Sequence, residues 1–403
     1  MIENKKSGRR EWLGVTSVLG AALAACKRPA PGEEAGPSLL GRPVSAYGER
    51  SPFEIAKRAL PDTRYPESAS SRTPLQESYG ILTPSSLHYE RHHAGVPKID
   101  PAQHRLLIHG KVSRPTVFTM ADLKRLPSVS RIHFLECSGN SGSEWGAKTA
   151  ATAAQSHGLA SCSEWTGVAL SLLLHEAGIA KDAKWLIAEG ADACKMQRSL
   201  PIDKAMDDAL LVWGQNGEAL RPEQGYPLRL LVPGWEGNIS VKWLWRLQAV
   251  EQPYMVRDET SHYTDSLPDG TARIFTFLME AKSLITFPSG GQKLPGPGLY
   301  EITGLAWSGR GRITRVEVST AGGASWRDAQ LQEPRLAKAF TRFRLPWDWD
   351  GSPAELQSRC TDETGYVQPA KDALVSVRGL NSQYHYNGMK SWKVLADGSV
   401  TNA

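Results

Sequence analysis

The sequence predicts an α+β fold in which a mixed first domain is followed by an immunoglobulin-like β-sandwich. A length of 403 residues corresponds to about two or three domains. The 37 glycines, 26 prolines and 13 tryptophans indicate many turns and short strands rather than a bundle of helices. Helix and strand patterns mix without a regular βαβ period up to about residue 270, and beyond it the pattern is all strand.

Residues 1–26 are expected to be an export signal and not part of the fold. The pair Arg9-Arg10 directly precedes an apolar stretch from Trp12 to Ala25, which favours a twin-arginine signal peptide over a general secretion signal. This signal predicts a periplasmic location. The stretch ends at 23–26 in Leu-Ala-Ala-Cys, which also resembles a lipoprotein cleavage box, so a lipid anchor at Cys26 and cleavage without a lipid both stay open.

Residues 27–75 are rich in Pro, Gly, Ser and charge, which predicts a tether and an extended arm that wraps the domain. The first domain is predicted over 76–268. Its clear elements are a strand at 105–110, a short helix at 119–126 with Thr119 as N-cap, an amphipathic helix at 168–177 stopped by Gly178, and a buried strand at 227–234 that ends in a turn.

The second domain is predicted over 269–403. Residues 312–319, the pair Gly322-Gly323 and residues 324–326 have the pattern of a β-hairpin, and 373–378 reads as a further strand. Short strands separated by Gly and Pro turns over about 130 residues are typical of an immunoglobulin-like sandwich.

Composition excludes whole classes of protein. A hydrophobic content of 40% excludes a disordered chain. The net charge of +5 is spread without a basic block, so no nucleic-acid partner is predicted. No apolar run reaches the roughly 20 residues of a membrane-spanning helix. Disulfides are the default expectation for four cysteines in an oxidising compartment, and these are Cys137, Cys162, Cys194 and Cys360.

Neither a Cys-x-x-Cys nor a Cys-x-x-Cys-His motif is present, so the sequence predicts no zinc site and no c-type haem in this chain. The segment Phe134-Leu-Glu-Cys-Ser-Gly-Asn140 carries the sharpest chemical signal. Cys137 closes an apolar strand and is followed by a flexible Gly-Asn pair, a place where a thiolate can hold a soft metal. Taken alone this signal is weak, because a buried inert cysteine is the more common case for any single cysteine.

Three further segments supply cationic and backbone groups of the kind that hold a phosphate. They are 89–97, with two histidines and an arginine, 215–229, which leads into a buried strand, and the glycine-rich turn 232–243. Bidentate arginine, a point-charge lysine and free N–H groups bind phosphate well. For any one of these segments alone, a solvated surface loop is the simpler interpretation.

Together these residues resemble the sulfite oxidase family of molybdenum enzymes. The resemblance runs from about 80 to about 396. The segments that show the resemblance are, in chain order, 91–97, the Cys-Ser-Gly-Asn of 137–140, the Gly-Tyr-Pro-Leu-Arg of 225–229, the Pro-Gly turn with Val-Lys-Trp of 233–243, and the Gly-Leu-Ala-Trp-Ser-Gly of 304–309. The resemblance implies a molybdopterin domain followed by a dimerisation domain, and therefore a homodimer formed through the C-terminal domain.

The resemblance also implies roles for individual residues. Cys137 matches the molybdenum ligand, Arg91 a substrate-side arginine, and Tyr263 the tyrosine beside the metal. The positions that match contacts of the molybdopterin cofactor are Tyr89, His93, Asp192, Gln224, Arg229, Gly237, Asn238, Ser240 and Lys242. Of these, Arg229 and Lys242 match the basic groups at the phosphate end, and Gln224 stands where the family often has histidine.

Within the family, 91–97, 136–141, 165–167, 221–227 and 384–394 are most similar to periplasmic sulfane dehydrogenases of thiosulfate oxidation. The family commonly has arginines after Cys-x-Gly-Asn, but Ser141 and Gly142 stand there in this chain. Loss of an arginine weakens a small dianion site. We expect Gly142 to give room for a sulfur chain on the cysteine of a carrier protein.

The implied reaction is oxygen-atom transfer from water to that sulfane sulfur. Electrons would leave singly to a separate c-type cytochrome subunit, in an α2β2 assembly. Two rival functions are a sulfite dehydrogenase that uses a cytochrome acceptor and, from a different class, an exported two-domain binding protein without a metal.

Overall fold

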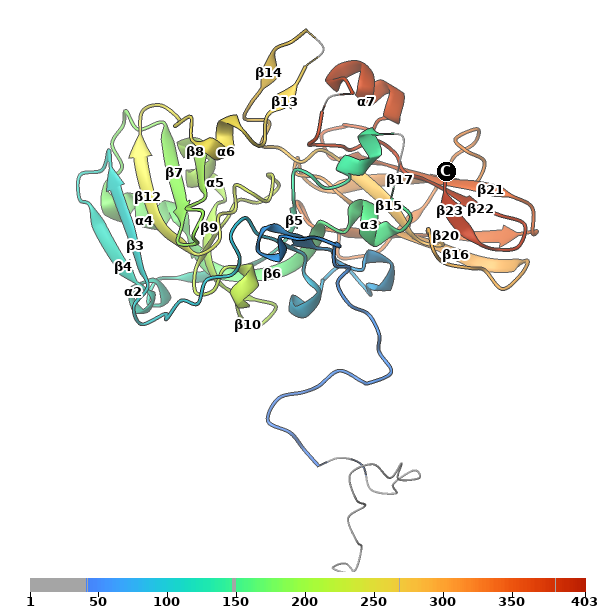
Figure 1. Ribbon diagram of the computed structural model, residues 1–403, viewed down its shortest axis with the longest axis horizontal. Coiled ribbons are helices and arrows are strands. Elements are labelled where there is room, and N and C mark those ends of the chain that lie inside the picture. The colour runs from blue at the N-terminus through green and yellow to red at the C-terminus, as the bar shows by residue number, and fades with distance from the viewer. Residues whose placement is uncertain (1–40, 42, 147–149, 268, 381) are drawn as a thin grey trace, which may run out of the picture. The chain divides into compact units, whose positions relative to one another are not determined.

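The computed structural model describes residues 41, 43–146, 150–267, 269–380 and 382–403 (Figure 1). The chain divides into two units, Met1–Ile55 and Ala56–Ala403. The second unit contains every helix and strand described below, and it is treated by itself. The predicted signal peptide and Cys26 lie outside the described residues. Within the described part of the chain, no helix is long and apolar enough to cross a membrane.

Two five-stranded sheets build the first part of the compact unit. One sheet has the order β10-β9-β6-β5, with β11 also paired to β9, and all its pairs are antiparallel. Its strands are β5 (Ser128–Glu136), β6 (Ala160–Ala169), β9 (Leu210–Gln215), β10 (Glu218–Ala219) and β11 (Arg229–Leu231). Cys137 directly follows the last residue of β5, so this sheet sets the position of the Cys137 backbone.

The other sheet has the order β4-β3-β12-β7-β8, in which only the pair of β3 and β12 is parallel among the described strands. Its strands are β3 (Arg105–Gly110), β4 (Thr116–Thr119), β7 (Trp185–Gly190), β8 (Gln197–Pro201) and β12 (Leu244–Val250). Apolar side chains of both sheets and of the helices α2 (Met120–Lys124) and α4 (Leu170–Ala177) form one buried cluster, which packs the two sheets together.

Short helices and two-stranded ribbons connect these sheets. The helices are α2 (Met120–Lys124), α3 (Ala153–His157), α4 (Leu170–Ala177), α5 (Ile202–Asp207) and α6 (Arg257–Thr260). The 3-10 turns are η1 (Pro66–Ser68), η2 (Leu75–Glu77), η3 (Ser85–Leu87), η4 (Gly142–Trp145) and η5 (Pro222–Gln224). The ribbons are β1 (Ser70–Ser71) with β2 (Glu90–Arg91), and β13 (Asp265–Ser266) with β14 (Ala272–Arg273).

The C-terminal part is a β-sandwich, as the sequence predicts. One sheet runs β15-β16-β20-β19 and the other β18-β17-β21-β22-β23. Their bounds are β15 (Lys282–Phe287), β16 (Gly298–Trp307), β17 (Ile313–Ser319), β18 (Arg327–Asp328), β19 (Gln330–Leu331), β20 (Thr341–Trp349), β21 (Ala354–Asp362), β22 (Ser391–Val394) and β23 (Val400–Asn402). Phe134 of β5 and Cys162 of β6 are buried in the same core as the sandwich residues, so the two parts share a core.

The predicted elements of the first domain are confirmed with shifted ends. Strand β3 covers 105–110, and α2 begins after Thr119, whose side chain accepts from the backbone N–H of Asp122 in a capping box. Helix α4 starts two residues later than predicted. It ends at Gly178, whose φ is +70° and whose Cβ would lie 1.9 Å from the Oγ of Ser113. Strand β11 keeps three residues of the predicted eight.

The predicted strand at 373–378 is wrong, because these residues lie in helix α7 (Lys371–Arg378). Leu374 and Arg378, four residues apart, face inward on one side of the helix. Leu374 packs with Trp145 and Tyr386. This packing outweighs the strand preference of the two valines. In the predicted hairpin, β17 is confirmed, while its partner β18 begins at Arg327 and not at residue 324.

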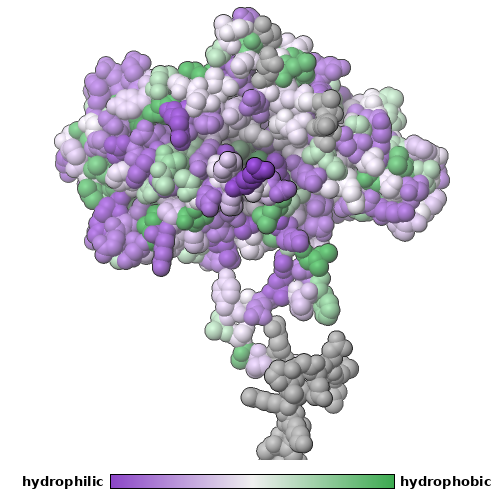
Figure 2. Space-filling model, in the orientation of Figure 1, coloured by the Kyte–Doolittle hydropathy of each residue, from purple (hydrophilic) through white to green (hydrophobic). Residues whose placement is uncertain are grey.

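Disulfides are only the default for an exported protein, and the sequence leaves the disulfide state open. In the structure the four described cysteines, Cys137, Cys162, Cys194 and Cys360, are all free thiols. Cys162 and Cys360 are buried in the core shared with the sandwich. Burial raises the pKa of the Cys162 thiol to about 12, so it stays protonated and behaves as a small apolar side chain. On the face drawn in Figure 2, hydrophobic residues are scattered among hydrophilic ones over the described surface.

Buried neutral histidines predict that the fold loses stability in mild acid. Burial lowers the pKa of His88 to about 3 and that of His133 to about 4, against roughly 6.5 in the unfolded chain. Between these values the unfolded state binds more protons, so the free energy of unfolding falls as the pH drops. At pH 5 the loss from His88 alone is roughly 2 kcal/mol. Urea unfolding of the metal-free protein at pH 7.5 and pH 5 measures this loss of unfolding free energy. Equal stability at both pH values would contradict the assignment of His88 and His133 as buried neutral histidines.

Candidate active site

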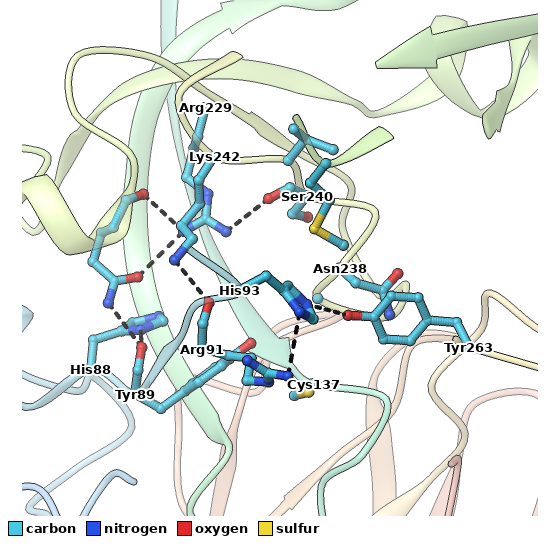
Figure 3. Close-up of a pocket in the computed structure, with 14 residues that line it drawn as sticks. His88, Tyr89, Arg91, His93, Cys137, Arg229, Asn238, Ser240, Lys242 and Tyr263 are labelled. Carbon is cyan, nitrogen blue, oxygen red and sulfur yellow. Dashed lines mark hydrogen bonds between the residues drawn. The ribbon is translucent and has the colours of Figure 1, made fainter. Parts of the chain in front are cut away.

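A cavity lies where β2, the end of β5, and the turn between β11 and β12 meet (Figure 3). None of the described residues that line it is acidic, and three are cationic. The residues that line the cavity are His88, Tyr89, Arg91, His93, Cys137, Met196, Gln224, Arg229, Gly237, Asn238, Ser240, Val241, Lys242 and Tyr263. Eleven of the twelve residues that the sequence assigns to the site therefore line this one cavity.

The remaining predicted residue, Asp192, lines a smaller neighbouring cavity together with Arg91, His93 and Lys242. Its Oδ2 accepts from the Sγ of Cys194 at 2.7 Å. Because several residues line both cavities, Asp192 stands at the border of the main cavity and not in it.

Arg229 and Lys242 form a cationic end of the cavity, away from Cys137 in Figure 3. Arg229 donates to the carbonyl of Gln224 and to that of Ser240, both at 3.0 Å, and its Nε has no partner among the described residues. Lys242 donates to the carbonyl of Arg91 at 3.0 Å. Burial, then the neighbouring Arg229, lowers the pKa of Lys242 well below its usual range. Two buried basic side chains, with no carboxylate among the described residues that line the main cavity, are expensive to keep charged unless an anion binds between them.

Cys137 lies at the other end of the cavity, directly after β5. Its backbone N–H donates to the carbonyl of Leu159 at 2.9 Å, and its carbonyl accepts from Asn140 at 2.8 Å, so the loop is fixed on both sides. Burial raises the pKa of the Cys137 thiol, although Arg91 opposes the rise. A metal that binds this sulfur therefore has to displace a proton from it.

Tyr263, His93 and Arg91 form a hydrogen-bonded chain beside Cys137. Burial lowers the pKa of His93 to about 3, so the ring is neutral. Its Nδ1 faces an Arg91 N–H at 3.5 Å, which leaves the hydrogen on Nε2, and Nε2 lies 2.9 Å from the Tyr263 hydroxyl. Because Nε2 donates to the Tyr263 oxygen, the hydroxyl hydrogen of Tyr263 is free to point into the cavity. Burial raises the pKa of Tyr263 above its usual range, so this hydrogen is retained.

Sequence reasoning missed four residues near the site. His88, Met196 and Val241 line the main cavity, and each adjoins a segment with predicted site residues. Tyr384 packs against Tyr263 with ring centroids 5.5 Å apart. The motif at 384–387 supports the family resemblance, but nothing in its pattern indicates which side chain reaches the site.

The structure corrects the expectation that Gly142 makes space for the substrate. Neither Ser141 nor Gly142 lines the cavity. A Cβ on Gly142 would lie 2.9 Å from the carbonyl oxygen of Gln383, so this glycine permits close packing of two loops. Gly139 is the glycine next to the thiol, since its Cβ would lie 4.0 Å from the Sγ of Cys137. Gly142 therefore does not enlarge the main cavity, and a side chain there would meet the Gln383 carbonyl.

Comparison with known proteins identifies the fold. Residues 93–257 match the oxidoreductase molybdopterin binding domain, and residues 273–391 match the Mo-co oxidoreductase dimerisation domain. Nitrate reductases are among the curated relatives. That of Hordeum vulgare is 32% identical over 329 residues, or 71% of this chain and 35% of that protein, and that of Ulva prolifera is 32% identical over 333 residues, or 72% and 38%. The chain thus spans little more than a third of the length of these relatives.

The chain belongs to the sulfite oxidase family of molybdopterin-binding oxidoreductases. Its solved relatives include the sulfane dehydrogenase SoxCD from Paracoccus pantotrophus, which is 48% identical. The match covers 94% of this chain and 99% of that one, with a TM-score of 0.89. The family resemblance, the α+β fold with its sandwich, and the molybdenum molybdopterin cofactor are thereby confirmed.

The residues of the cavity fit that cofactor. Arg229 and Lys242 offer buried positive charge at one end, where a phosphate binds well. The Oδ1 of Asn238 is buried without a partner among the described residues, and Gly237 has no room for a Cβ, which would lie 2.6 Å from the Tyr89 hydroxyl. Cys137 provides one thiolate at the opposite end. This donor set suits a metal that receives its other ligands from the cofactor.

Proposed function

We propose that the protein is a periplasmic, molybdenum-dependent sulfane dehydrogenase. It oxidises sulfane sulfur bound to a cysteine of a carrier protein and passes the electrons to a c-type cytochrome subunit. The observation that carries the proposal is the likeness to a sulfane dehydrogenase at 48% identity over nearly the whole chain. The single thiolate in a cavity with a cationic end supports it independently.

The reaction adds one oxygen atom from water to the terminal sulfur in each step. Each step forms one S–O bond and releases two electrons and two protons, and the electrons leave one at a time to the cytochrome. When bound, the molybdenum cofactor supplies the two-electron redox change that this chemistry needs. The chain supplies the binding and orientation of the reacting groups.

Arg91 and Tyr263 are the residues that would hold the anionic sulfur. Arg91 presents positive charge at the Cys137 end of the cavity. Tyr263 lines the same end of the cavity, and when its oxygen accepts from His93 its hydroxyl hydrogen is available to the anion. A cation and a neutral donor together bind and orient an anion. Neutral His93 fixes Tyr263 in position and does not store the released protons, since its pKa is about 3.

The proposed assembly follows from the two matched domains. The second domain matches a dimerisation domain, which supports a homodimer formed through the sandwich. The solved relative is named as a two-component SoxCD enzyme, which supports a separate redox subunit and an α2β2 complex. Export through the twin-arginine signal, and a lipid anchor at Cys26, remain proposals from the sequence.

Measuring turnover of the molybdenum-loaded protein with two candidate substrates tests which of them it oxidises. The first is sulfite, and the second is a protein that carries a persulfide on one cysteine, each with an artificial one-electron acceptor. We expect faster turnover of the persulfide. Brisk turnover of sulfite with none of the persulfide would instead make the protein a sulfite dehydrogenase. This alternative gains weight because Gly142 does not widen the cavity.

A further inference from the structure

A buried polar cluster joins the Cys137 loop to the sandwich domain. Its centre is the carboxylate of Glu136, the residue directly before Cys137, and it is fully buried. One oxygen, Oε1, accepts from the Lys282 ammonium at 2.5 Å and from the Asn140 amide at 2.8 Å. The other oxygen, Oε2, accepts from the Trp307 indole N–H at 2.6 Å. Lys282 and Trp307 belong to β15 and β16 of the sandwich and are almost completely buried.

The same cluster closes the loop that carries the thiol. Asn140 bonds to the Glu136 side chain and also accepts the backbone N–H of Leu159 at 3.0 Å through its Oδ1. The carbonyl of Glu136 accepts from the N–H of Gly237 at 2.6 Å, in the turn that lines the cavity. Cys137 therefore lies in a loop whose two ends, Glu136 and Asn140, are joined by a side-chain hydrogen bond. Two side chains of the sandwich hydrogen-bond to the same carboxylate.

We propose that Lys282 and Trp307 are positioning residues for Cys137, so that the dimerisation domain helps to set the geometry of the metal's thiolate ligand. Without both donors, the Glu136 carboxylate would lose the partners that hold it beside Asn140, and the loop that carries Cys137 would be held less firmly. Reactions at a metal are sensitive to displacements of this size. The inference rests on the proposed role of Cys137 as the molybdenum ligand.

The test compares two tryptophans of the same core. Trp307→Phe removes the N–H that reaches Glu136. Trp392→Phe is the matched control, because Trp392 is also fully buried in that core and its N–H donates to the carbonyl of Ile285 at 3.1 Å. Both variants lose one buried hydrogen bond, but only the first loses one that reaches the Cys137 loop.

Two measurements separate positioning from general loosening. The first is the electron paramagnetic resonance spectrum of Mo(V), produced by reductive titration without any sulfur substrate. The second is the rate at which iodoacetamide alkylates Cys137 in the metal-free protein, followed by peptide mass spectrometry. We expect Trp307→Phe to shift the Mo(V) spectrum and to raise the alkylation rate, with kcat about tenfold lower. We expect Trp392→Phe to match the parent protein in all three.

An unchanged Mo(V) spectrum and alkylation rate in Trp307→Phe would overturn the proposal, and so would equal changes in both tryptophan variants. If Trp307→Phe does not fold, Lys282→Gln is the second variant, because it replaces the ion pair with Glu136 by a weaker neutral hydrogen bond, and the same two measurements apply. Failure of the proposed function has a different signature: a Cys137→Ser protein whose Mo(V) spectrum equals that of the parent would show that the thiolate is not the ligand.

Discussion

Replacing Cys137 by serine is expected to lower the oxidation rate of the sulfur substrate by at least about a thousandfold, or about 4 kcal/mol in the activation free energy. Cys137 is the only described sulfur ligand in the cavity besides the thioether of Met196. A serine oxygen is a harder donor than a thiolate, so it suits molybdenum in this site less well. The measurement is kcat normalised to molybdenum content, so that loss of metal is not counted as loss of catalysis.

Cys194→Ser is the control for this substitution. Cys194 is also a half-buried free thiol, but it lines neither cavity, and a serine hydroxyl keeps its hydrogen bond to Asp192. We expect this variant to retain the parent's rate within about twofold. A metal-containing Cys137→Ser protein with full activity would end the assignment of Cys137.

Replacing Lys242 by methionine is expected to reduce retention of the cofactor strongly. A hydrogen bond to a charged group contributes about 1.5–3 kcal/mol, so the cofactor should dissociate about 10- to 150-fold more readily. The reason is that Lys242 and Arg229 supply the buried positive charge at the end of the cavity that suits a phosphate. Molybdenum per protein after extensive gel filtration gives the measurement.

Arg246→Met is the matched control, because it removes one positive charge outside both cavities. Arg246 pairs with Glu189 on the neighbouring strand β7. This variant should keep the molybdenum content of the parent. Full molybdenum in Lys242→Met, or equal loss in both variants, would show that the cationic end does not hold the cofactor.

The site was predictable because its residues sit in short segments with distinct chemistry. Cys137 follows an apolar strand and precedes Gly-Asn, a pattern that indicates a thiol at a strand end. Arg229 and Lys242 lie on either side of one glycine-rich turn, so their proximity follows from local sequence. The family resemblance assigned the roles, which residue types alone left open.

Contacts between distant segments were not predictable from the sequence. Glu136 meets Lys282 and Trp307 across 146 and 171 residues, and no periodicity indicates such a pairing. The true surroundings of Gly142 depend in the same way on a loop near the C-terminus. Helix α7 was misread because its valines favour a strand locally, while the packing of Leu374 decides the structure.

The most direct test of the central claim is a turnover experiment in H₂¹⁸O. The molybdenum-loaded protein is incubated without O₂ with a one-electron acceptor and a carrier protein that has a persulfide on one cysteine. The mass of the product is measured by mass spectrometry. We expect a cysteine-bound sulfur chain that has gained ¹⁸O atoms, with two electrons transferred per atom, and no such product with Cys137→Ser. An unoxidised chain, despite confirmed molybdenum and an active acceptor, would contradict it.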